Sequence, residues 1–362
     1  MQIAGARAWA CDIPVLRPRT DAVQSFLSQE TIFVEVTTKE GATGRGYAYT
    51  IGFGGSAVVA LLRDYLLDEL IGLDSGSPEA VWRHLLAHCR SLMVGPVTTL
   101  ALAAIDTAIW DVRSKALGLP IHKLAGGARQ FVPVYDTEGG WLHLGIDELA
   151  SGAAEAVAAG RQGVKVKVGK PSASEDVERL RAVREAIGPS AALMVDANQS
   201  FTRDEAVRRA RLYEPFDLAW LEEPLPADDV EGHAFLARST SVPIAVGETM
   251  YSLAQFREYL AAGAASVVQP DVARVGGITP WLKIAHLAEA FGLPVAPHFL
   301  MELHVSLAAA VPNGRWVEWI PQLAPVTTSS ISLEDGAAWP PDAPGLGIDW
   351  DDEAIGRLSA GG

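Results

Sequence analysis

The chain has 362 residues, with 29 lysines and arginines against 44 acidic residues and a formal net charge of −15. This balance argues against a nucleic-acid-binding protein, which needs a basic face to neutralise phosphates. It does not argue against a small anionic substrate held by a local cluster of cations. Hydrophobic residues make up 49% of the chain, yet no apolar run approaches the roughly 20 residues that span a bilayer. We therefore expect a soluble globular protein without a membrane partner.

Two features favour a cytoplasmic location. The N-terminus, from Met1 to Gly5, lacks the basic patch and apolar stretch of a signal peptide. The two cysteines, Cys11 and Cys89, are too few for a disulfide framework and indicate a reducing compartment. We expect both to be small, buried apolar side chains.

The first part of the chain has the pattern of a small α+β domain. Residues 31–37 alternate like a half-buried strand, and residues 41–49 form a glycine-rich turn into another strand. Three predicted helices follow, at residues 58–73, 79–92 and 98–117. Strands followed by a run of helices predict a compact α+β domain over residues 1–125.

From residue 131 the pattern changes to strands that alternate with helices. Eight candidate strands cover residues 131–135, 164–168, 192–195, 219–221, 244–246, 266–269, 295–296 and 315–319. Helices fall between them, for example at residues 175–187, 203–213 and 280–291. This alternation predicts a parallel sheet, and eight strands favour a closed barrel. An open, doubly wound sheet is the alternative, but Gly139-Gly140 is a poor match to its glycine-rich phosphate loop. The proline- and glycine-rich tail from residue 321 is expected to run back over the first domain.

Ionisable side chains end seven consecutive candidate strands. They are Lys165 and Lys167, Asp196, Glu222 and Glu223, Glu248, Asp271, His298 and Glu318. Taken alone, each is most often a helix cap, a solvated charge or a core histidine. Barrel enzymes place their catalytic groups at the carboxyl ends of the strands, so seven such groups on one rim indicate a shared site.

Three of these groups predict a metal site. Asp196, Glu222 and Glu248 follow adjacent strands and offer the hard oxygen ligands that Mg²⁺ prefers. A zinc site would need more histidine or cysteine. Period-two alternation places Lys165 and Lys167 on one face of their strand, where they supply a base whose pKa neighbouring cations would lower.

The opposite side of the barrel offers a second base. Asp271 can orient His298 through one ring nitrogen and so fix its tautomer. Two bases facing each other across a metal suit removal of a proton alpha to a carboxylate, with the metal stabilising the resulting enediolate.

At this point the chain resembles a family. The Lys165-x-Lys167 pair, the three carboxylates, the Asp271/His298 pair and Glu318 together resemble the enolase superfamily, mandelate racemase subgroup. The resemblance implies an α/β fold, with a modified (β/α)7β TIM-like barrel over residues 126–320. It also implies an N-terminal α+β capping domain over residues 1–125 and a C-terminal segment, residues 321–362, that returns to this domain.

The resemblance assigns the site residues one by one. It implies one Mg²⁺ per subunit, replaceable by Mn²⁺, on Asp196, Glu222 and Glu248; the family pattern uses Glu222 rather than Glu223. Lys167 would be one acid/base. We also expect a homo-oligomer.

The remaining implied roles concern the substrate. His298, oriented by Asp271, would be the second acid/base. Lys165 and Glu318 would contact the substrate carboxylate from opposite sides, and Asn198 would contact a substrate hydroxyl.

The reaction follows from shorter stretches. Residues 274–280 and 297–304 resemble galactarate/talarate-type acid-sugar dehydratases, and residues 135–140 are similar except at Asp136 and Glu138. This implies a hydro-lyase of carbohydrate catabolism that converts an aldarate or aldonate to a 2-keto-3-deoxy acid. A racemase or epimerase of a 2-hydroxy acid, acting by two-base 1,1-proton transfer, is the alternative. A catalytically silent binding protein on the same fold is a third reading.

Substrate choice in this family lies mainly in two cap loops, expected at residues 16–26 and 49–56. In the first, Arg17 or Arg19 could fork onto the distal carboxylate of an aldarate, or both could be solvated. In the second, Tyr49 and Phe53 could shape the pocket or pack the cap.

Overall fold

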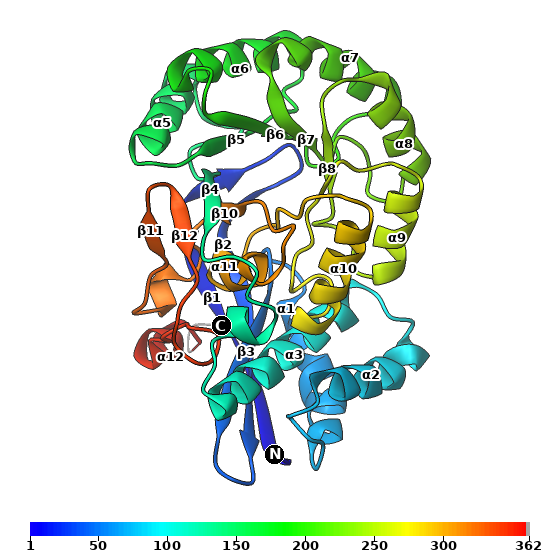
Figure 1. Ribbon diagram of the computed structural model, residues 1–362, viewed down its shortest axis with the longest axis vertical. Coiled ribbons are helices and arrows are strands. Elements are labelled where there is room, and N and C mark those ends of the chain that lie inside the picture. The colour runs from blue at the N-terminus through cyan, green and yellow to red at the C-terminus, as the bar shows by residue number, and fades with distance from the viewer. Residues whose placement is uncertain (360–362) are drawn as a thin grey trace.

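The structure, a computed structural model in which residues 1–359 are described, begins with a three-stranded antiparallel sheet (Figure 1). β1 (Ile3–Thr20) pairs with β2 (Ser25–Thr38), and β2 pairs with β3 (Thr43–Thr50). The predicted strand at residues 31–37 lies inside β2, whereas β1 is not predicted. β1 contains Pro14 and Pro18, which are tolerated because an edge strand can spare a ladder hydrogen bond.

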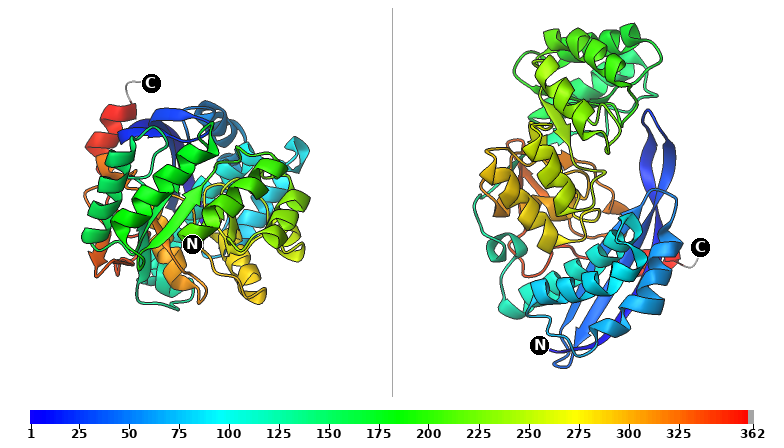
Figure 2. Two further views of the ribbon diagram at one scale, coloured as in Figure 1. Left: turned by 90° about the horizontal axis from the view of Figure 1, so that it is seen from above. Right: turned by 90° about the vertical axis from the view of Figure 1, so that its right-hand side faces the viewer.

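The first expected cap loop, residues 16–26, is mostly strand, which corrects the sequence prediction. Only residues 21–24 form the turn, and Asp21 Oδ1 accepts hydrogen bonds from the backbone N–H groups of Val23 and Gln24 at 2.7 and 2.8 Å. The hairpin extends past the rest of the sheet toward the barrel (Figure 2, right). There the backbone N–H of Leu142 donates to Thr20 O at 2.9 Å. The hairpin tip is thus tied to the barrel.

The helices of the cap pack on this sheet. α3 (Pro96–Leu117) lies against β3, where a Cβ on Gly46 would collide with the backbone of Ala104, so glycine permits the close approach. α2 (Pro78–His88) and the 3₁₀ turn η3 (Cys89–Leu92) together cover residues 78–92, close to the predicted helix. α4 (Ile121–Leu124) follows α3.

The predicted single helix at residues 58–73 is wrong. α1 (Gly55–Leu61) passes into a π-helical turn, η1 (Leu62–Leu66), and then a 3₁₀ turn, η2 (Asp68–Leu70). Leu62, Leu66 and Leu70 are all fully buried. This spacing of four residues keeps one apolar face toward the core through the change of helix type.

Parallel strands form the barrel in chain order. They are β4 (Val132–Asp136), β5 (Gly163–Lys167), β6 (Ala192–Asp196), β7 (Leu218–Glu222), β8 (Ile244–Val246), β9 (Val267–Val268) and β10 (Val317–Trp319). The seventh predicted strand is reduced to Val295, which bridges Val268 on one side and Gly314 on the other. β10 pairs with β4, so the ring closes.

Helices follow the strands on the outside of the barrel (Figure 1). They are α5 (Ile146–Ala158), α6 (Ala173–Ile187), α7 (Arg203–Tyr213), α8 (Val230–Ser239), α9 (Leu253–Ala261), α10 (Ile278–Ala290) and α11 (Met301–Ala310), with the 3₁₀ turn η4 (Glu214–Phe216) after α7. Ser172, Thr202, Asp229 and Ser252 cap α6 to α9 with their side chains. The predicted helices at residues 175–187, 203–213 and 280–291 correspond to α6, α7 and α10.

The barrel interior is filled below the strand ends. Its buried cluster is Tyr135, Met194, Trp220, Ala245, Val267 and Ala296, from six different strand positions. Because side chains alternate along a strand, Met194 and Asp196 share one face of β6, and Trp220 and Glu222 share one face of β7. The apolar layer therefore forms a floor beneath the charged strand ends.

The end of the chain returns to the cap. β11 (Ser332–Glu334) and β12 (Ala337–Trp339) form a hairpin on β4, after the 3₁₀ turn η5 (Ala324–Val326). The N–H groups of Gly345 and Leu346 donate to Ser114 Oγ and Asp111 Oδ1 of α3, each at 2.8 Å. α12 (Asp352–Ser359) contacts β1. The fold is thus α/β, a (β/α)7β TIM-like barrel with an N-terminal α+β cap, which confirms the predicted fold class.

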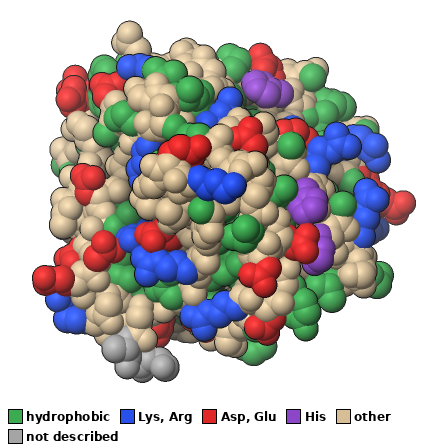
Figure 3. Space-filling model, turned by 90° about the horizontal axis from the view of Figure 1, so that it is seen from below, with side chains coloured by type: hydrophobic (Ala, Val, Ile, Leu, Met, Phe, Trp, Pro, Cys, Tyr) green, Lys and Arg blue, Asp and Glu red, His purple; other side chains and the backbone are tan. Residues whose placement is uncertain are grey.

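Two further expectations concern side chains. Cys11 and Cys89 are both free and buried. Figure 3 shows a face on which acidic and basic side chains are interspersed, rather than gathered into one basic patch. Within residues 1–359, no helix has the length and hydropathy to cross a membrane.

Candidate metal and acid/base site

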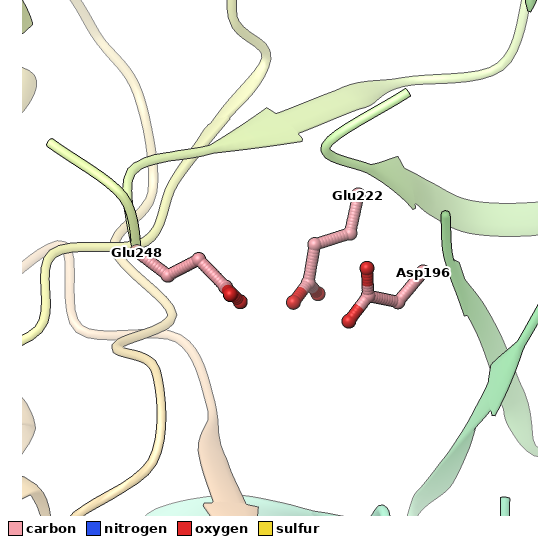
Figure 4. Close-up of side chains that lie close together, drawn as sticks. All are labelled: Asp196, Glu222 and Glu248. Atoms are coloured by element: carbon pink, nitrogen blue, oxygen red, sulfur yellow. The ribbon is translucent and has the colours of Figure 1, made fainter. Parts of the chain in front are cut away.

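Three carboxylates converge at the carboxyl ends of β6, β7 and β8. Asp196 and Glu222 are the last residues of β6 and β7, and Glu248 follows β8 by two residues. One oxygen from each lies within 4.8 Å of the others, and Figure 4 shows the side chains pointing into a common space. Gly247 makes the turn before Glu248 with φ 147°, and a Cβ there would lie 2.7 Å from the backbone of Gln269.

The central carboxylate, Glu222, is held by donors on both oxygens. Its Oε2 accepts from Trp220 Nε1 at 2.9 Å and Gln269 Nε2 at 2.7 Å, and its Oε1 lies 2.8 Å from Lys165 Nζ. Burial nevertheless raises the pKa of Glu222 to about 8, with Lys165 opposing and Asp196 adding to the effect. Protein groups alone therefore stabilise the ionised form of Glu222 poorly.

The other two carboxylates differ in their bonding. Asp196 Oδ1 accepts from the Asn198 N–H at 2.8 Å, and Asp196 Oδ2 pairs with Lys167. Glu248 Oε2 is buried, and no group within the described part of the chain makes a hydrogen bond to it. Three carboxylate ligands, with the buried Glu248 Oε2 free of hydrogen bonds, fit Mg²⁺. They do not fit a zinc site, which is rich in histidine or cysteine.

Both lysines of β5 reach this cluster. Lys165 is 1% exposed, and its Nζ lies 2.8 Å from Glu222 Oε1 and from Glu318 Oε1. Lys167 Nζ lies 2.5 Å from Asp196 Oδ2 and 3.0 Å from Asn198 Oδ1. Burial disfavours the charged amines, but the neighbouring carboxylates outweigh it and raise the pKa of both lysines. Among the protein groups, the Lys165 charge acts on the pKa of Lys167 in the expected downward direction, but the carboxylates outweigh it.

Glu318, on β10, is fixed on the same side as Lys165. Its Oε1 accepts from Thr137 Oγ1 at 2.7 Å, and its Oε2 accepts from the Phe299 N–H at 2.7 Å. Burial favours the neutral acid, but Lys165 overcomes this and holds the pKa of Glu318 well below its usual range. Glu318 is therefore an ionised hydrogen-bond acceptor beside the cavity.

Asp271 and His298 form the predicted pair. His298 Nδ1 lies 2.9 Å from Asp271 Oδ2, while His298 Nε2 lies 3.3 Å from Glu248 Oε2. Because a carboxylate accepts, the proton is assigned to Nδ1, which leaves Nε2 directed toward the carboxylate triad. Burial favours a neutral Asp271, but the bond from His298 outweighs it and lowers the pKa of Asp271. Burial likewise disfavours a charged His298, but Glu248 and Asp271 raise its pKa.

A cavity of about 180 Å³ opens above these groups. Five predicted site residues line it: Lys167, Asn198, Glu248, His298 and Glu318. The cap closes it from above with residues of the β1–β2 turn and the loop after β3, namely Asp21, Val23, Gln24, Phe26 and Ile51. The predicted groups on seven separate strand ends thus share one cavity or its immediate wall.

The other eight lining residues are not predicted as site residues, although the sequence analysis names Glu223 as a strand-end carboxylate. They are Thr137, Trp141, Gln199, Glu223, Thr249, Arg274, Phe299 and Ile320. Gln199, Glu223 and Thr249 each directly follow a predicted site residue, so the strand-end rule, extended by one position, would have found them. Arg274 follows Asp271 by three residues. Trp141, 5.4 Å from Lys167 Nζ at its ring centroid, carries no such signal.

Backbone strain gathers at the same rim. Eight non-glycine residues within the described range 1–359 have positive φ. Five of them follow β6, β7 or Val295 closely: Asn198, Gln199, Glu223, Phe299 and Leu300. Such conformations cost of order 1–3 kcal/mol each and persist where surrounding structure demands them. Their position indicates that these strand ends are shaped for function rather than for stability.

The structure does not bring Arg17, Arg19 or Tyr49 to the wall of this cavity. Arg17 is exposed on β1. Arg19 is fully buried, and its guanidinium pairs with Glu138 and donates to Gln322 Oε1. Tyr49 is buried and donates its hydroxyl proton to Asp271 Oδ2 at 2.6 Å. It lines a second pocket next to the cavity, and Phe53 lines this pocket too.

This arrangement is typical of one class of protein, a barrel enzyme with a divalent metal held by carboxylates at the strand ends. The N-terminal domain model of the mandelate racemase/muconate lactonizing enzyme family matches residues 7–126, and the enolase C-terminal domain-like model matches residues 148–354. The chain belongs to the enolase superfamily, in the mandelate racemase subgroup.

Relatives agree with this assignment over nearly their whole length. The chain is 39% identical over 348 residues to L-talarate/galactarate dehydratase of Salmonella typhimurium, covering 94% of this chain and 87% of the relative. It is 37% identical over 351 residues to 3,6-anhydro-alpha-L-galactonate cycloisomerase of Streptomyces coelicolor, covering 96% and 97%. The crystal structure of L-talarate dehydratase from Polaromonas sp. JS666, complexed with Mg and L-glucarate, superposes with a TM-score of 0.94 at 40% identity, covering 99% of this chain and 97% of the other.

Proposed function

We propose that the protein is an Mg²⁺-dependent dehydratase of an acid sugar, an aldarate or aldonate of galactarate or talarate type. One observation carries the proposal. The triad of Asp196, Glu222 and Glu248 lies between two candidate proton carriers, with Lys167 Nζ at the Asp196 end and His298 Nε2 at the Glu248 end. Dehydration next to a carboxylate needs such groups on both sides of a cation.

The proposed dehydration removes one water molecule from the acid sugar in two proton transfers. A base takes the proton from the carbon next to the substrate carboxylate, and the electron pair moves toward that carboxylate. An acid then protonates the 3-hydroxyl, which leaves as water, and the enol product becomes a 2-keto-3-deoxy acid. Bound Mg²⁺ supplies positive charge that stabilises the carboxylate as its negative charge grows.

The residues divide this work as follows. Lys167 acts as one acid/base, and His298, held by Asp271, acts as the other. Lys165 and Glu318 lie 2.8 Å apart, so they border the substrate carboxylate from the same side rather than from opposite sides, and Lys165 supplies the positive charge there. Asn198 contacts a substrate hydroxyl. Asp196, Glu222 and Glu248 hold the cation.

The polar side chains of the cavity support a polyhydroxy acid. Asn198, Gln199 and Thr249 offer amide and hydroxyl groups on one side of the cavity. Arg274 lines both this cavity and the neighbouring pocket, and its guanidinium makes no ion pair with the described residues. A second carboxylate on the substrate, at the end away from the reacting carbon, would satisfy this charge.

A panel of aldonic and aldaric acids tests the proposal. Incubation with the protein and Mg²⁺ should yield keto acid, detected as a semicarbazone, and EDTA should abolish it until Mg²⁺ is restored. His298→Asn is the matched control, because it removes one acid/base and leaves the carboxylate triad in place. A panel that gives no keto acid overturns dehydration.

The same panel in D₂O separates the racemase alternative. Deuterium that enters the substrate without loss of water, together with inversion of that carbon, would establish a racemase or epimerase of a 2-hydroxy acid. Unchanged substrate without any exchange would favour a silent binding protein. A cytoplasmic location and a homo-oligomeric state remain predictions, which fractionation and light scattering test.

A further inference from the structure

We propose that Tyr49, on β3 of the cap, is a positioning residue for His298 and acts through Asp271. The inference rests on the acid/base role proposed for His298. The Asp271/His298 pair belongs to the barrel, and Tyr49 would add a hydrogen bond to it from the cap.

The contacts of Asp271 carry the argument. Its Oδ2 accepts from the Tyr49 hydroxyl at 2.6 Å and from His298 Nδ1 at 2.9 Å. Its Oδ1 accepts from the N–H groups of Ala273 at 2.8 Å and Arg274 at 3.2 Å. Asp271 is fully buried, so these four donors take the place of water around the carboxylate.

Tyr49 itself is held rigidly. Its side chain is 2% exposed, and its ring packs on Phe299, the neighbour of His298, with 4.8 Å between the ring centroids. The Arg274 guanidinium carbon lies 5.8 Å from the centroid of the same ring. Because Tyr49 does not line the catalytic cavity, its hydroxyl contacts Asp271 and not the substrate.

The consequence concerns geometry at His298. Two donors on one oxygen fix the rotation of the Asp271 carboxylate, and the carboxylate fixes the ring plane and tautomer of His298. His298 Nε2 is then aimed at the cavity. Since Tyr49 is 222 residues away from Asp271 in the chain and belongs to the cap, the pair is complete only when the cap lies on the barrel.

A conservative substitution tests the proposal, and the chain offers a matched control. Tyr49→Phe removes only the hydroxyl that bonds Asp271. Tyr47→Phe removes a hydroxyl two residues earlier on the same face of β3. Tyr47 is 1% exposed, and its hydroxyl has no hydrogen-bond partner among the described residues. Tyr49→Phe should lower kcat about 10- to 100-fold with KM changed less than about threefold. Tyr47→Phe should retain the wild-type kcat.

A double-mutant cycle shows whether Tyr49 acts through Asp271. In an Asp271→Asn background, Tyr49→Phe should lower kcat less than about twofold further, because the pathway is already broken. Losses that multiply would overturn the proposal, as would equal losses in Tyr49→Phe and Tyr47→Phe.

An NMR measurement tests the positioning role of Tyr49 independently of the proposed dehydratase activity. In the Mg²⁺-loaded protein, the low-field proton signal of His298 Nδ1–H is assigned by its loss in His298→Asn. The signal should move in Tyr49→Phe and stay in place in Tyr47→Phe. If no acid sugar is turned over, the proposed function fails while this shift still supports the positioning role. An unmoved signal in Tyr49→Phe overturns the role whatever the substrate.

Discussion

His298 Nε2 lies 3.3 Å from Oε2 of Glu248, the oxygen of the carboxylate triad that has no hydrogen-bond donor among the described residues. A proton carrier thus borders the proposed cation site directly. A substitution at His298 would therefore also change the immediate surroundings of a proposed metal ligand.

The metal ligands can be told apart from their neighbours by substitution. Glu222→Gln should weaken Mg²⁺ binding about 100-fold and remove activity, because it replaces one of three anionic ligands with a neutral amide. Calorimetric titration with Mg²⁺ measures the affinity.

Glu223→Gln is the matched control, since Glu223 is equally buried but lies outside the triad. It should bind Mg²⁺ with nearly wild-type affinity. The ligand assignment is wrong if Glu223→Gln loses the metal and Glu222→Gln keeps it.

The base on β5 is the subject of a second prediction. Lys167→Met should lower kcat about 10³-fold, the usual contribution of a positioned acid/base, while Mg²⁺ binding persists. Lys170→Met, three residues further on and without an ion pair among the described residues, should keep its activity. Steady-state rates with the best substrate of the panel decide the matter, and an active Lys167→Met would remove Lys167 from the mechanism.

Arg274 predicts a preference for diacids. The ratio of kcat/KM for an aldarate to that for the aldonate of the same configuration should fall about 10-fold or more in Arg274→Met, because a bidentate charge-assisted contact is lost only with the diacid. Arg17→Met should leave this ratio unchanged, since Arg17 is exposed and does not line the cavity. A lowered ratio in Arg17→Met alone would instead restore the expected role of the cap arginine.

His304, which does not line the cavity, predicts that the stability of the fold is sensitive to acid. It is buried, accepts from the Val272 N–H at Nε2 (3.1 Å) and donates from Nδ1 to Phe299 O (2.8 Å), so both nitrogens require the neutral ring. Burial lowers its pKa from 6.5 to about 4. The unfolded chain binds a proton here below pH 6.5 and the folded chain does not, so stability falls between pH 6.5 and 4 by about 3 kcal/mol.

His304→Asn should lack this part of the pH dependence. Urea unfolding at several pH values should show its deficit relative to the wild type shrinking as the pH falls. His286→Asn, at an exposed histidine, should follow the wild-type curve. Parallel curves for His304→Asn and the wild type would contradict the assignment.

The sequence predicts best what depends on one strand end at a time. Asp196, Glu222 and Glu248 were placed together because each follows a strand of a parallel barrel, a rule that needs no knowledge of packing. The hydrogen bond between Tyr49 and Asp271 depends on how the cap sits on the barrel, and no local pattern encodes that distance.

The surroundings of Arg19 also could not be predicted from the local sequence. An arginine near a turn is typical of a solvated or ligand-binding charge, but Arg19 is buried, and its partners Glu138 and Gln322 lie far along the chain. Burial of this ion pair could be recognised only once the three segments had met.

That meeting of three segments bears on how such enzymes diversify. The hairpin that roofs the cavity is anchored by Arg19 to the loop after β4 and to the segment after β10. A transplanted hairpin without an arginine at this position would leave the partly buried Glu138 carboxylate without its cation unless Glu138 and Gln322 were replaced with it. The roof is therefore not an interchangeable module, and a new substrate preference has to be acquired as a coordinated set of changes at three distant places in the gene.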